Sequence, residues 1–266
     1  MLKRRLIPVL FLKEGFLVRS EKFTIHQNLG NPVAQVKRYN LWDVDELIYI
    51  DISREEHYDR KREDQGLENP NNIYDIIKMV SKECFMPLTF GGRIRTLDDI
   101  RKRLELGADK VTINTHALNE PEFINKAASV FGSQCIIVSM DVLRMDDAVN
   151  GSHYQVCKDF GKVAVDKTPL DWALEAQERG AGEIFLNSID RDGMACGYDV
   201  EIIKTISSAL TIPVIACGGA AKDSDFAEVY DKTDVSAVAA GNTFHFKEMS
   251  YVYAKQYLRK RNYNIR

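Results

Sequence analysis

The chain has 266 residues, of which 45% are hydrophobic and 28% charged, the composition of an ordinary globular protein. Its net charge of −3 argues against nucleic acid or an anionic membrane as a partner. No apolar run is long enough to span a membrane, and the N-terminus lacks a signal-peptide pattern. The five cysteines have neither CxxC nor metal-binding spacing, so we expect reduced thiols, a cytoplasmic location and no metal site.

Short apolar runs alternate with helical patterns along the chain, as in parallel strands joined by helices. The expected strands are 5–11, 46–51, 86–90, 109–113, 134–141, 183–188, 212–216 and 235–239. The expected helices are 31–42, 71–83, 97–106, 120–130, 169–179, 199–208, 223–230 and 247–260. Eight such units favour a TIM (β/α)8 barrel over an open doubly wound sheet. No linker divides residues 1–266, so we expect a single domain.

Two segments interrupt this alternation of strands and helices. Residues 53–70 are highly charged, and residues 143–168 are polar with scattered glycines. Both are expected to be long loops on the catalytic face, where such loops are usually active-site coverings or partly disordered. A lid or partner contact is favoured over a plain solvated insertion.

The two halves of the chain repeat each other, which indicates a barrel built from two duplicated half-barrels. The glycine pairs Gly91-Gly92 and Gly218-Gly219 follow corresponding strands of the two halves. The first strands differ at the end that matters for chemistry, because one finishes at Phe11 and the other at Asp141.

Each glycine pair is a candidate phosphate site, since exposed backbone N–H groups near a helix start attract anions. A tight turn would explain one pair, but two pairs at matched positions favour a ligand with a phosphate at each end. Arg93, directly after the first pair, either reinforces an anion site or points to solvent.

Polar residues gather at or just beyond the carboxyl ends of the expected strands. Asp141 is the best candidate for a general acid or base, because burial at a strand end raises a carboxyl pKa. Aspartates at such positions also cap loops, and the turn after residue 189 fits that alternative. The set is Asp51, Asn114, Asp141, Asn187, Ser188, Asp190 and Asp192.

Charged residues open, or nearly open, four strands at their other ends: Arg5, Glu46, Lys110 and Glu183. Alternating charges at the bottom of a barrel would pair into a ring over its axis. The bottom face normally serves stability. A ring of four that closes the bore could instead be a gate.

The chain carries five distinctive motifs: Gly-Ala-Asp-Lys-Val-Thr-Ile-Asn-Thr (107–115), Phe-Gly-Ser-Gln (131–134), Arg-Gly-Ala-Gly-Glu-Ile (179–184), Ser-Ile-Asp-Arg-Asp-Gly (188–193) and Phe-His-Phe (244–246). With these motifs the chain resembles the HisF family, the cyclase subunits of imidazole glycerol phosphate synthase. The resemblance implies a duplicated barrel that needs no cofactor and binds a separate glutaminase at its N-terminal face. Ammonia then crosses the barrel and attacks a doubly phosphorylated ribotide, in histidine biosynthesis.

Several residues match this family position by position. The gate matches Arg5, Glu46, Lys110 and Glu183, and Asp109 matches a glutaminase contact. Asp141 matches the second catalytic aspartate and Asn114 the asparagine after the fourth strand. The matched phosphate and substrate positions are Asp51, Gly91, Gly92, Ser188, Asp192, Gly193, Gly218 and Gly219.

The departures lie at the chemical face. Phe11 replaces the first catalytic aspartate, Arg19 a lysine, Arg93 a third glycine and Asn187 a threonine. Segment 239–246, with Gly241 and Asn242, has one residue more than the usual phosphate segment. Of residues 8–19 only Glu14 offers a carboxylate, and it reaches the site only if its loop folds inward.

This pattern resembles HisF-type paralogues found beside sugar amidotransferases in clusters that make acetamidino sugars. That relationship implies a barrel that still takes ammonia from a glutaminase and delivers it to a phosphorylated or sugar acceptor, with a sugar amidotransferase as a further partner. Two alternatives remain: an authentic cyclase of histidine biosynthesis, and a non-catalytic scaffold that only activates its glutaminase.

Overall fold

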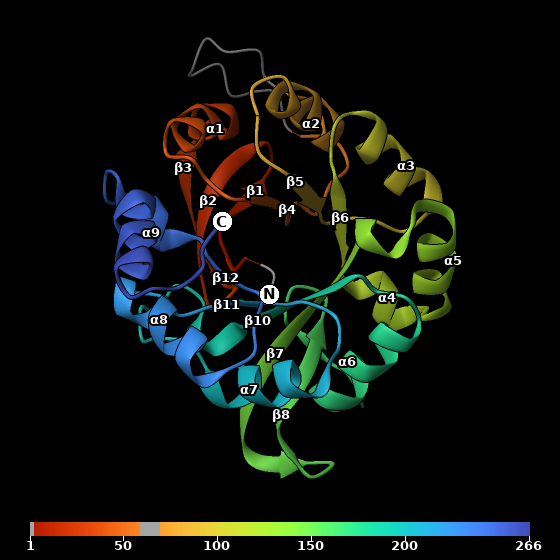
Figure 1. The fold of residues 1–266 in the computed structure, drawn as a ribbon. Helices are drawn as coiled ribbons and strands as arrows, with labels where there is room; N and C mark the ends of the chain where they lie inside the picture. The colour runs from red at the N-terminus through yellow and green to blue at the C-terminus, as the bar shows by residue number, and fades with distance from the viewer. Residues whose placement is uncertain (1–2, 59–69) are drawn as a thin grey trace.

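The computed structural model describes residues 3–58 and 70–266 and contains a closed barrel (Figure 1). Eight parallel strands of the described chain run in the order β10-β11-β12-β1-β4-β5-β6-β7, and pairing of β7 with β10 closes the circle. Their bounds are β1 (Arg5–Lys13), β4 (Leu47–Asp51), β5 (Leu88–Gly91), β6 (Lys110–Ile113), β7 (Ile136–Val149), β10 (Glu183–Ser188), β11 (Val214–Cys217) and β12 (Ala237–Ala240). The predicted TIM barrel is confirmed.

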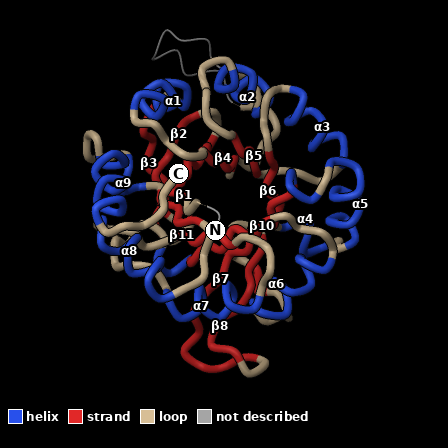
Figure 2. Tube along the Cα trace, viewed as in Figure 1, coloured by secondary structure: helices blue, strands red, loops and turns tan. Residues whose placement is uncertain are grey.

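Helices surround the barrel on its outer side (Figure 2). They are α1 (Pro32–Leu41), α2 (Ile73–Ser81), α3 (Leu97–Glu105), α5 (Glu122–Phe131), α6 (Pro169–Glu178), α7 (Val200–Ala209), α8 (Asp223–Lys232) and α9 (Ser250–Lys260). Local sequence sets several starts: Thr96 and Asp99 form a capping box for α3, and Thr168 caps α6 just before a proline. A short helix that the sequence pattern missed, α4 (Thr115–Asn119), follows β6. Single-turn 3-10 helices lie at Ser133–Cys135, Ile189–Arg191 and Asn242–Phe244.

Apolar side chains form two layers because successive strand residues point to opposite faces. One layer packs between the strands and the helices, where Tyr49 and Phe90 stack with ring centroids 4.9 Å apart. The other fills the bore and includes Ile7, Val9, Phe11, Ile48, Ile137, Phe185, Ile215 and Ala239. The bore is therefore packed, and polar groups lie mainly at its two ends.

The prediction of an irregular loop over 143–168 was wrong for most of its length. β7 continues to Val149 and turns back into β8 (Ser152–Lys158), which pairs with β9 (Val163–Ala164). Asn150 and Gly151, both at positive φ, make the tight turn that suits a two-residue hairpin. Of the other expected loop, 53–70, residues 59–69 lie outside the described residues.

The first half carries a matching hairpin that the sequence reading also missed. β1 turns back at Glu14-Gly15 into β2 (Phe16–Glu21), which pairs with β3 (Ile25–Gly30). Positive φ recurs at corresponding turns, at Lys22-Phe23 in one half and Asp159-Phe160 in the other. The repeat thus extends to the segments that rise above the barrel mouth.

Candidate functional site

At the N-terminal end of the bore, four charged side chains form the closed ring that the sequence predicted. Arg5 donates to Glu46 Oε2 and to Glu183 Oε2, each at 2.6 Å. Lys110 Nζ donates to Glu46 Oε1 at 2.8 Å and also to Glu183. Each cation therefore bridges both carboxylates, and the two positive and two negative charges balance.

Mutual attraction in the ring favours the charged forms of Arg5 and Glu183 against the effect of burial. Glu46 and Glu183 are buried. Burial opposes the charge on Glu183, but Arg5 and Lys110 outweigh it and lower the pKa of that carboxyl. Burial likewise opposes the charge on Arg5, and attraction to Glu183 and Glu46 raises its pKa. The four side chains thus close the end of the bore through ion pairs.

Hydroxyl groups line one wall of the bore between this ring and the mouth. Thr89 is the register partner of Lys110 and has a fully buried side chain. Within the described residues, neither the Thr89 nor the Thr112 hydroxyl has a hydrogen-bond partner. Thr112 and Ser139 reach the floor of the mouth. The opposite wall is apolar, with Phe185 and Ile215.

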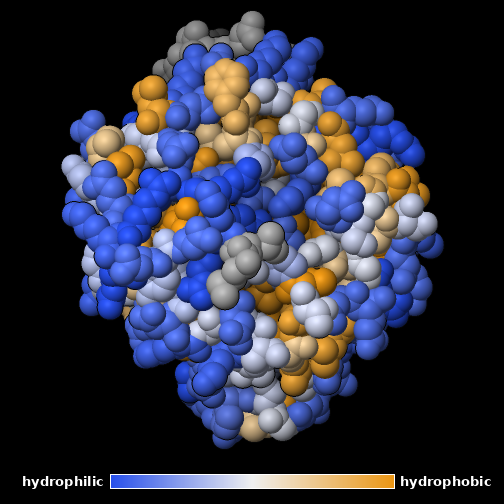
Figure 3. All heavy atoms as spheres, in the orientation of Figure 1, coloured by the Kyte–Doolittle hydropathy of each residue, from blue (hydrophilic) through white to orange (hydrophobic). Residues whose placement is uncertain are grey.

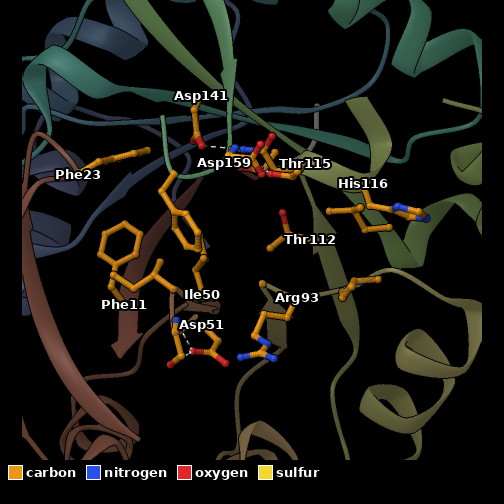
Figure 4. A pocket seen from close by; sticks show the side chains of 18 of the residues that line it. Phe11, Phe23, Ile50, Asp51, Arg93, Thr112, Thr115, His116, Asp141 and Asp159 are labelled. Atoms are coloured by element: carbon orange, nitrogen blue, oxygen red, sulfur yellow. Dashed lines mark hydrogen bonds between the residues drawn. The ribbon is translucent and has the colours of Figure 1, made fainter. Parts of the chain in front are cut away.

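At the C-terminal end of the barrel, the described residues line a cavity of about 670 Å³ and another of about 500 Å³. Among the predicted site residues, the larger is lined by Phe11, Asp51, Gly92, Arg93, Asn114, Asp141 and Asn187 (Figure 4). The smaller is lined by Phe11, Arg19, Asp192, Gly193, Gly218, Gly219, Gly241 and Asn242. Gly91 and Ser188 line neither cavity.

Asp141 lines the larger cavity together with Asp51 and Asp159. The Asn114 amide donates to Asp141 Oδ2 at 2.6 Å, which orients the carboxyl toward the cavity. Burial raises the pKa of Asp141 to about 7, even though this hydrogen bond favours the charged form. A carboxyl with that pKa can both release and accept a proton near neutral pH.

Phe11 occupies the corresponding position in the first half, and its side chain lines both cavities. It is 7% exposed, packs in the apolar cluster of the bore, and pairs in register with Ile50 and Val18. Glu14 does not replace the missing acid, because it lies exposed in the β1–β2 turn and lines neither cavity.

The first glycine loop is shaped by close backbone contacts. A side chain at Gly92, where φ is +85°, would meet the Asp51 carbonyl oxygen at 2.0 Å, so only glycine fits. Arg93 follows at φ +60°, and its guanidinium donates to the Glu55 carbonyl and lies beside Asp51 (Figure 4). Burial raises the pKa of Asp51, against hydrogen bonds from Ser53 and Tyr58.

The second glycine loop is also shaped by a close backbone contact, and the loops that follow β10 and β12 beside it bond to Ser20 of β2. A side chain at Gly219 would meet the Gly197 carbonyl oxygen at 2.1 Å. Asn242 donates to the Ser20 carbonyl at 2.8 Å. Asp192 accepts from the Ser20 hydroxyl at 2.6 Å, and burial raises its pKa. Arg19 pairs with Glu21 at 2.6 Å.

Several residues of the larger cavity were not foreseen. Phe23 and Phe160 approach from the two hairpins, and Arg54, Arg95 and Lys162 add positive charge around the opening. The repeated Glu-Gly and Asn-Gly turns were the signal that could have revealed these hairpins. Asp190, also in the predicted set, instead accepts from the Arg144 backbone N–H at 3.1 Å.

Over residues 3–58 and 70–266 no helix is long and apolar enough to cross a membrane, and no His, Cys, Asp and Glu side chains group to hold a metal.

Comparison with known proteins gives a consistent set of relatives. The model of a family described as "Histidine biosynthesis protein" matches residues 5–250. The imidazole glycerol phosphate synthase subunit HisF of Hydrogenobaculum is 39% identical over the full length of both chains. A provisionally named imidazole glycerol phosphate synthase subunit hisF2 of Vibrio vulnificus is 42% identical over all of this chain and 92% of that protein. HisF of Alkaliphilus metalliredigens is 39% identical over the full length of both chains.

Proposed function

The chain belongs to the histidine biosynthesis protein family as a HisF-type subunit of the imidazole glycerol phosphate synthase class, and from this premise we propose a function. The protein receives ammonia from a glutaminase bound at the N-terminal face of the barrel. It delivers that ammonia to a phosphorylated or sugar acceptor at the mouth, for acetamidino-sugar formation, with a sugar amidotransferase as a second partner.

One observation argues against the ribotide as the acceptor. The end of β1 presents Phe11 where the end of the equivalent strand β7 presents Asp141. A phenyl ring can neither donate nor accept a proton, so a ring closure that uses two acids loses one of them. General acid–base groups typically contribute about 10²- to 10⁴-fold to a rate. The loss therefore argues against the ribotide cyclisation.

The route for ammonia follows from the order of polar groups along the bore. The ring of Arg5, Glu46, Lys110 and Glu183 lies at the entrance. Thr89 and Thr112 follow with unpartnered hydroxyls, which can hydrogen-bond a small polar molecule on its way to Asp141. Passage requires a transient opening of the ring, because its ion pairs close the axis.

Residues that line the two cavities have different roles at the mouth of the barrel. Asp141, oriented by Asn114, is the group that takes a proton from the attacking nitrogen or gives one to a departing oxygen. The glycine loops at Gly92 and Gly218-Gly219 suit phosphate groups, since backbone N–H groups at such turns favour anions. Phe11 contributes an apolar surface between them.

The test is ammonia-dependent turnover of the ribulosyl ribotide by the purified chain. We expect negligible turnover, and no rescue of a histidine auxotroph that lacks its own cyclase subunit. Robust turnover would return the protein to histidine biosynthesis. That second candidate is favoured by the Asp141–Asn114 pair and by 39% identity to HisF proteins over the whole chain. A pure scaffold would instead bind no phosphorylated ligand at either cavity.

A further inference from the structure

Two exposed aromatic rings form part of the wall of the smaller cavity at the mouth. Phe246 is 61% exposed and Tyr253 is 48% exposed, and both line the cavity together with the second glycine loop. Phe246 follows the 3-10 helix at Asn242–Phe244, and Tyr253 lies near the start of α9. Exposed apolar side chains that gather at a cavity mark a ligand-binding groove rather than core packing.

A cation lies beside each of these rings. The Arg19 guanidinium is 5.6 Å from the ring centroid of Phe246, and Lys247 Nζ is 5.7 Å from that of Tyr253. Three cations and two carboxylates line the cavity: Arg19, Lys222, Lys247, Asp192 and Asp223. Burial raises the pKa of both carboxyl groups, which weakens their opposition to an anion. The cavity therefore offers flat apolar surface and positive charge side by side.

Two buried polar atoms of the cavity wall also await a partner. Among the described residues, neither Ser250 Oγ nor Arg19 Nε has a hydrogen-bond partner, and both side chains line the cavity. Ser250 is 6% exposed. Thr243 donates to the Ala220 carbonyl at 2.6 Å, which fixes this wall to the glycine loop. Buried polar groups are rarely left unpaired, so these two point to a polar ligand.

The combination of rings and cations narrows the class of ligand. A free phosphate or a simple sugar phosphate would pair with the cations and leave both rings uncovered. A nucleobase stacks on aromatic side chains, because every base presents a π face. The phosphates that a nucleotide carries next to its base suit charge-assisted hydrogen bonds from arginine and lysine. A nucleotide thus matches the rings and the cations with one molecule.

We propose that the smaller cavity binds the nucleotide end of a nucleotide-activated sugar, with the base on Phe246 and Tyr253 and the phosphates at Gly218-Gly219. This inference rests on the proposed function and names its acceptor: a sugar linked through phosphates to a nucleoside. The sugar extends past Phe11, which lines both cavities, toward Asp141 in the larger one. Figure 3 views the opposite, N-terminal end of the barrel, so a glutaminase bound there leaves the nucleotide site open.

The experiment is titration calorimetry of the full chain with three probes: UDP, ADP and ribose 5-phosphate. At least one nucleotide should bind about 10-fold more tightly than ribose 5-phosphate, because only the nucleotides carry a base to stack. The variant F246A/Y253A should bind that nucleotide about 5- to 100-fold more weakly, with its affinity for ribose 5-phosphate unchanged. The variant F246W keeps a flat ring and should retain nucleotide binding.

The matched control is Phe85→Ala, which removes an aromatic ring that is 88% exposed and lines neither cavity. It should bind all three probes as the unchanged protein does. Circular dichroism of each variant verifies folding, which these exposed positions should leave unchanged.

Three results would overturn the inference. Nucleotides that bind no more tightly than ribose 5-phosphate would show that the base makes no contact. An F246A/Y253A variant that keeps full nucleotide affinity would place the base elsewhere. An equal loss for nucleotide and ribose 5-phosphate would show that the two rings only shape the phosphate site.

The proposed function is tested separately from this site. Nucleotide binding that depends on the two rings, in a chain that also converts the ribulosyl ribotide robustly, would support the site and overturn the proposed function. Acetamidino-sugar formation by a chain that binds neither nucleotide would support the proposed function and overturn the site.

Discussion

The two ends of the barrel hold buried charge in opposite ways. At the N-terminal end, two cations and two carboxylates neutralise one another in a closed ring, and the pKa of Glu183 is lowered. At the mouth, Asp51, Asp141 and Asp192 are each bonded to neutral donors, and burial raises their pKa values. At the N-terminal end, ion pairs close the bore and favour the charged form of Glu183. At the mouth, burial favours the protonated form of the three carboxyl groups, and perturbed carboxyl pKa values are characteristic of sites that move protons.

The largest expected effect is on activity at the mouth. Asp141→Asn keeps the shape of the side chain but removes its proton, so ammonia-dependent conversion of the acceptor should fall by about 10²- to 10⁴-fold. Asp190→Asn is the matched control, because Asp190 lines neither cavity and its carboxylate accepts from the Arg144 backbone N–H. Initial rates with ammonium chloride measure both variants. Equal losses would mean that Asp141 has no special role.

The next largest effect is a loss of stability when one member of the charged ring is removed. Glu183→Ala leaves Arg5 and Lys110 with one carboxylate between them, and removing one partner of a buried ion pair typically costs about 3–5 kcal/mol. Urea denaturation measures the change in the free energy of unfolding. The control is Glu228→Ala on α8, whose exposed pair with Lys232 should contribute below about 1 kcal/mol. A ring variant that unfolds like this control would mean that the ring contributes little to stability.

An effect of similar size should appear in the pH dependence of stability. The pKa of Asp141 is raised to about 7 in the folded protein, from about 3.9 in an unfolded chain. Its contribution is therefore fully present below about pH 4 and is lost as the pH rises toward 7. Relative to Asp141→Asn, the unchanged protein should lose stability between pH 4 and 7 and then level off. A constant difference between the two unfolding free energies over that range would contradict the raised pKa.

The smallest expected effect is the gain from Phe11→Asp. Restoring the acid alone should increase ribotide cyclisation by less than about 10-fold, well below the usual contribution of an acid–base group. The reason is that Arg19, Arg93 and Asn187 also shape the two cavities. Steady-state turnover with ammonia is the measurement. A rise of 100-fold or more would identify Phe11 as the sole block to cyclase chemistry.

Much of the fold could be predicted because it depends on local pattern. Runs such as 183–188 are apolar, short and followed by turn residues, and each became a barrel strand. The ring was foreseeable for a similar reason, since Arg5, Lys110 and Glu183 each open a strand, and strand openings meet at one end of a parallel barrel. The hairpins were missed because their polar strands lack the buried alternation from which strands are recognised, and their pairing is decided by two-residue turns.

The sequence by itself thus determined the barrel, the duplication and the chemical difference between Phe11 and Asp141. Only the tertiary structure decided that Phe11 borders both cavities, that Glu14 stays outside them, and that Asn242 donates to Ser20. Strand periodicity is local and can be read from neighbouring residues. These contacts join segments far apart in the chain, so they depend on barrel closure, hairpin register and loop packing, which no single segment encodes.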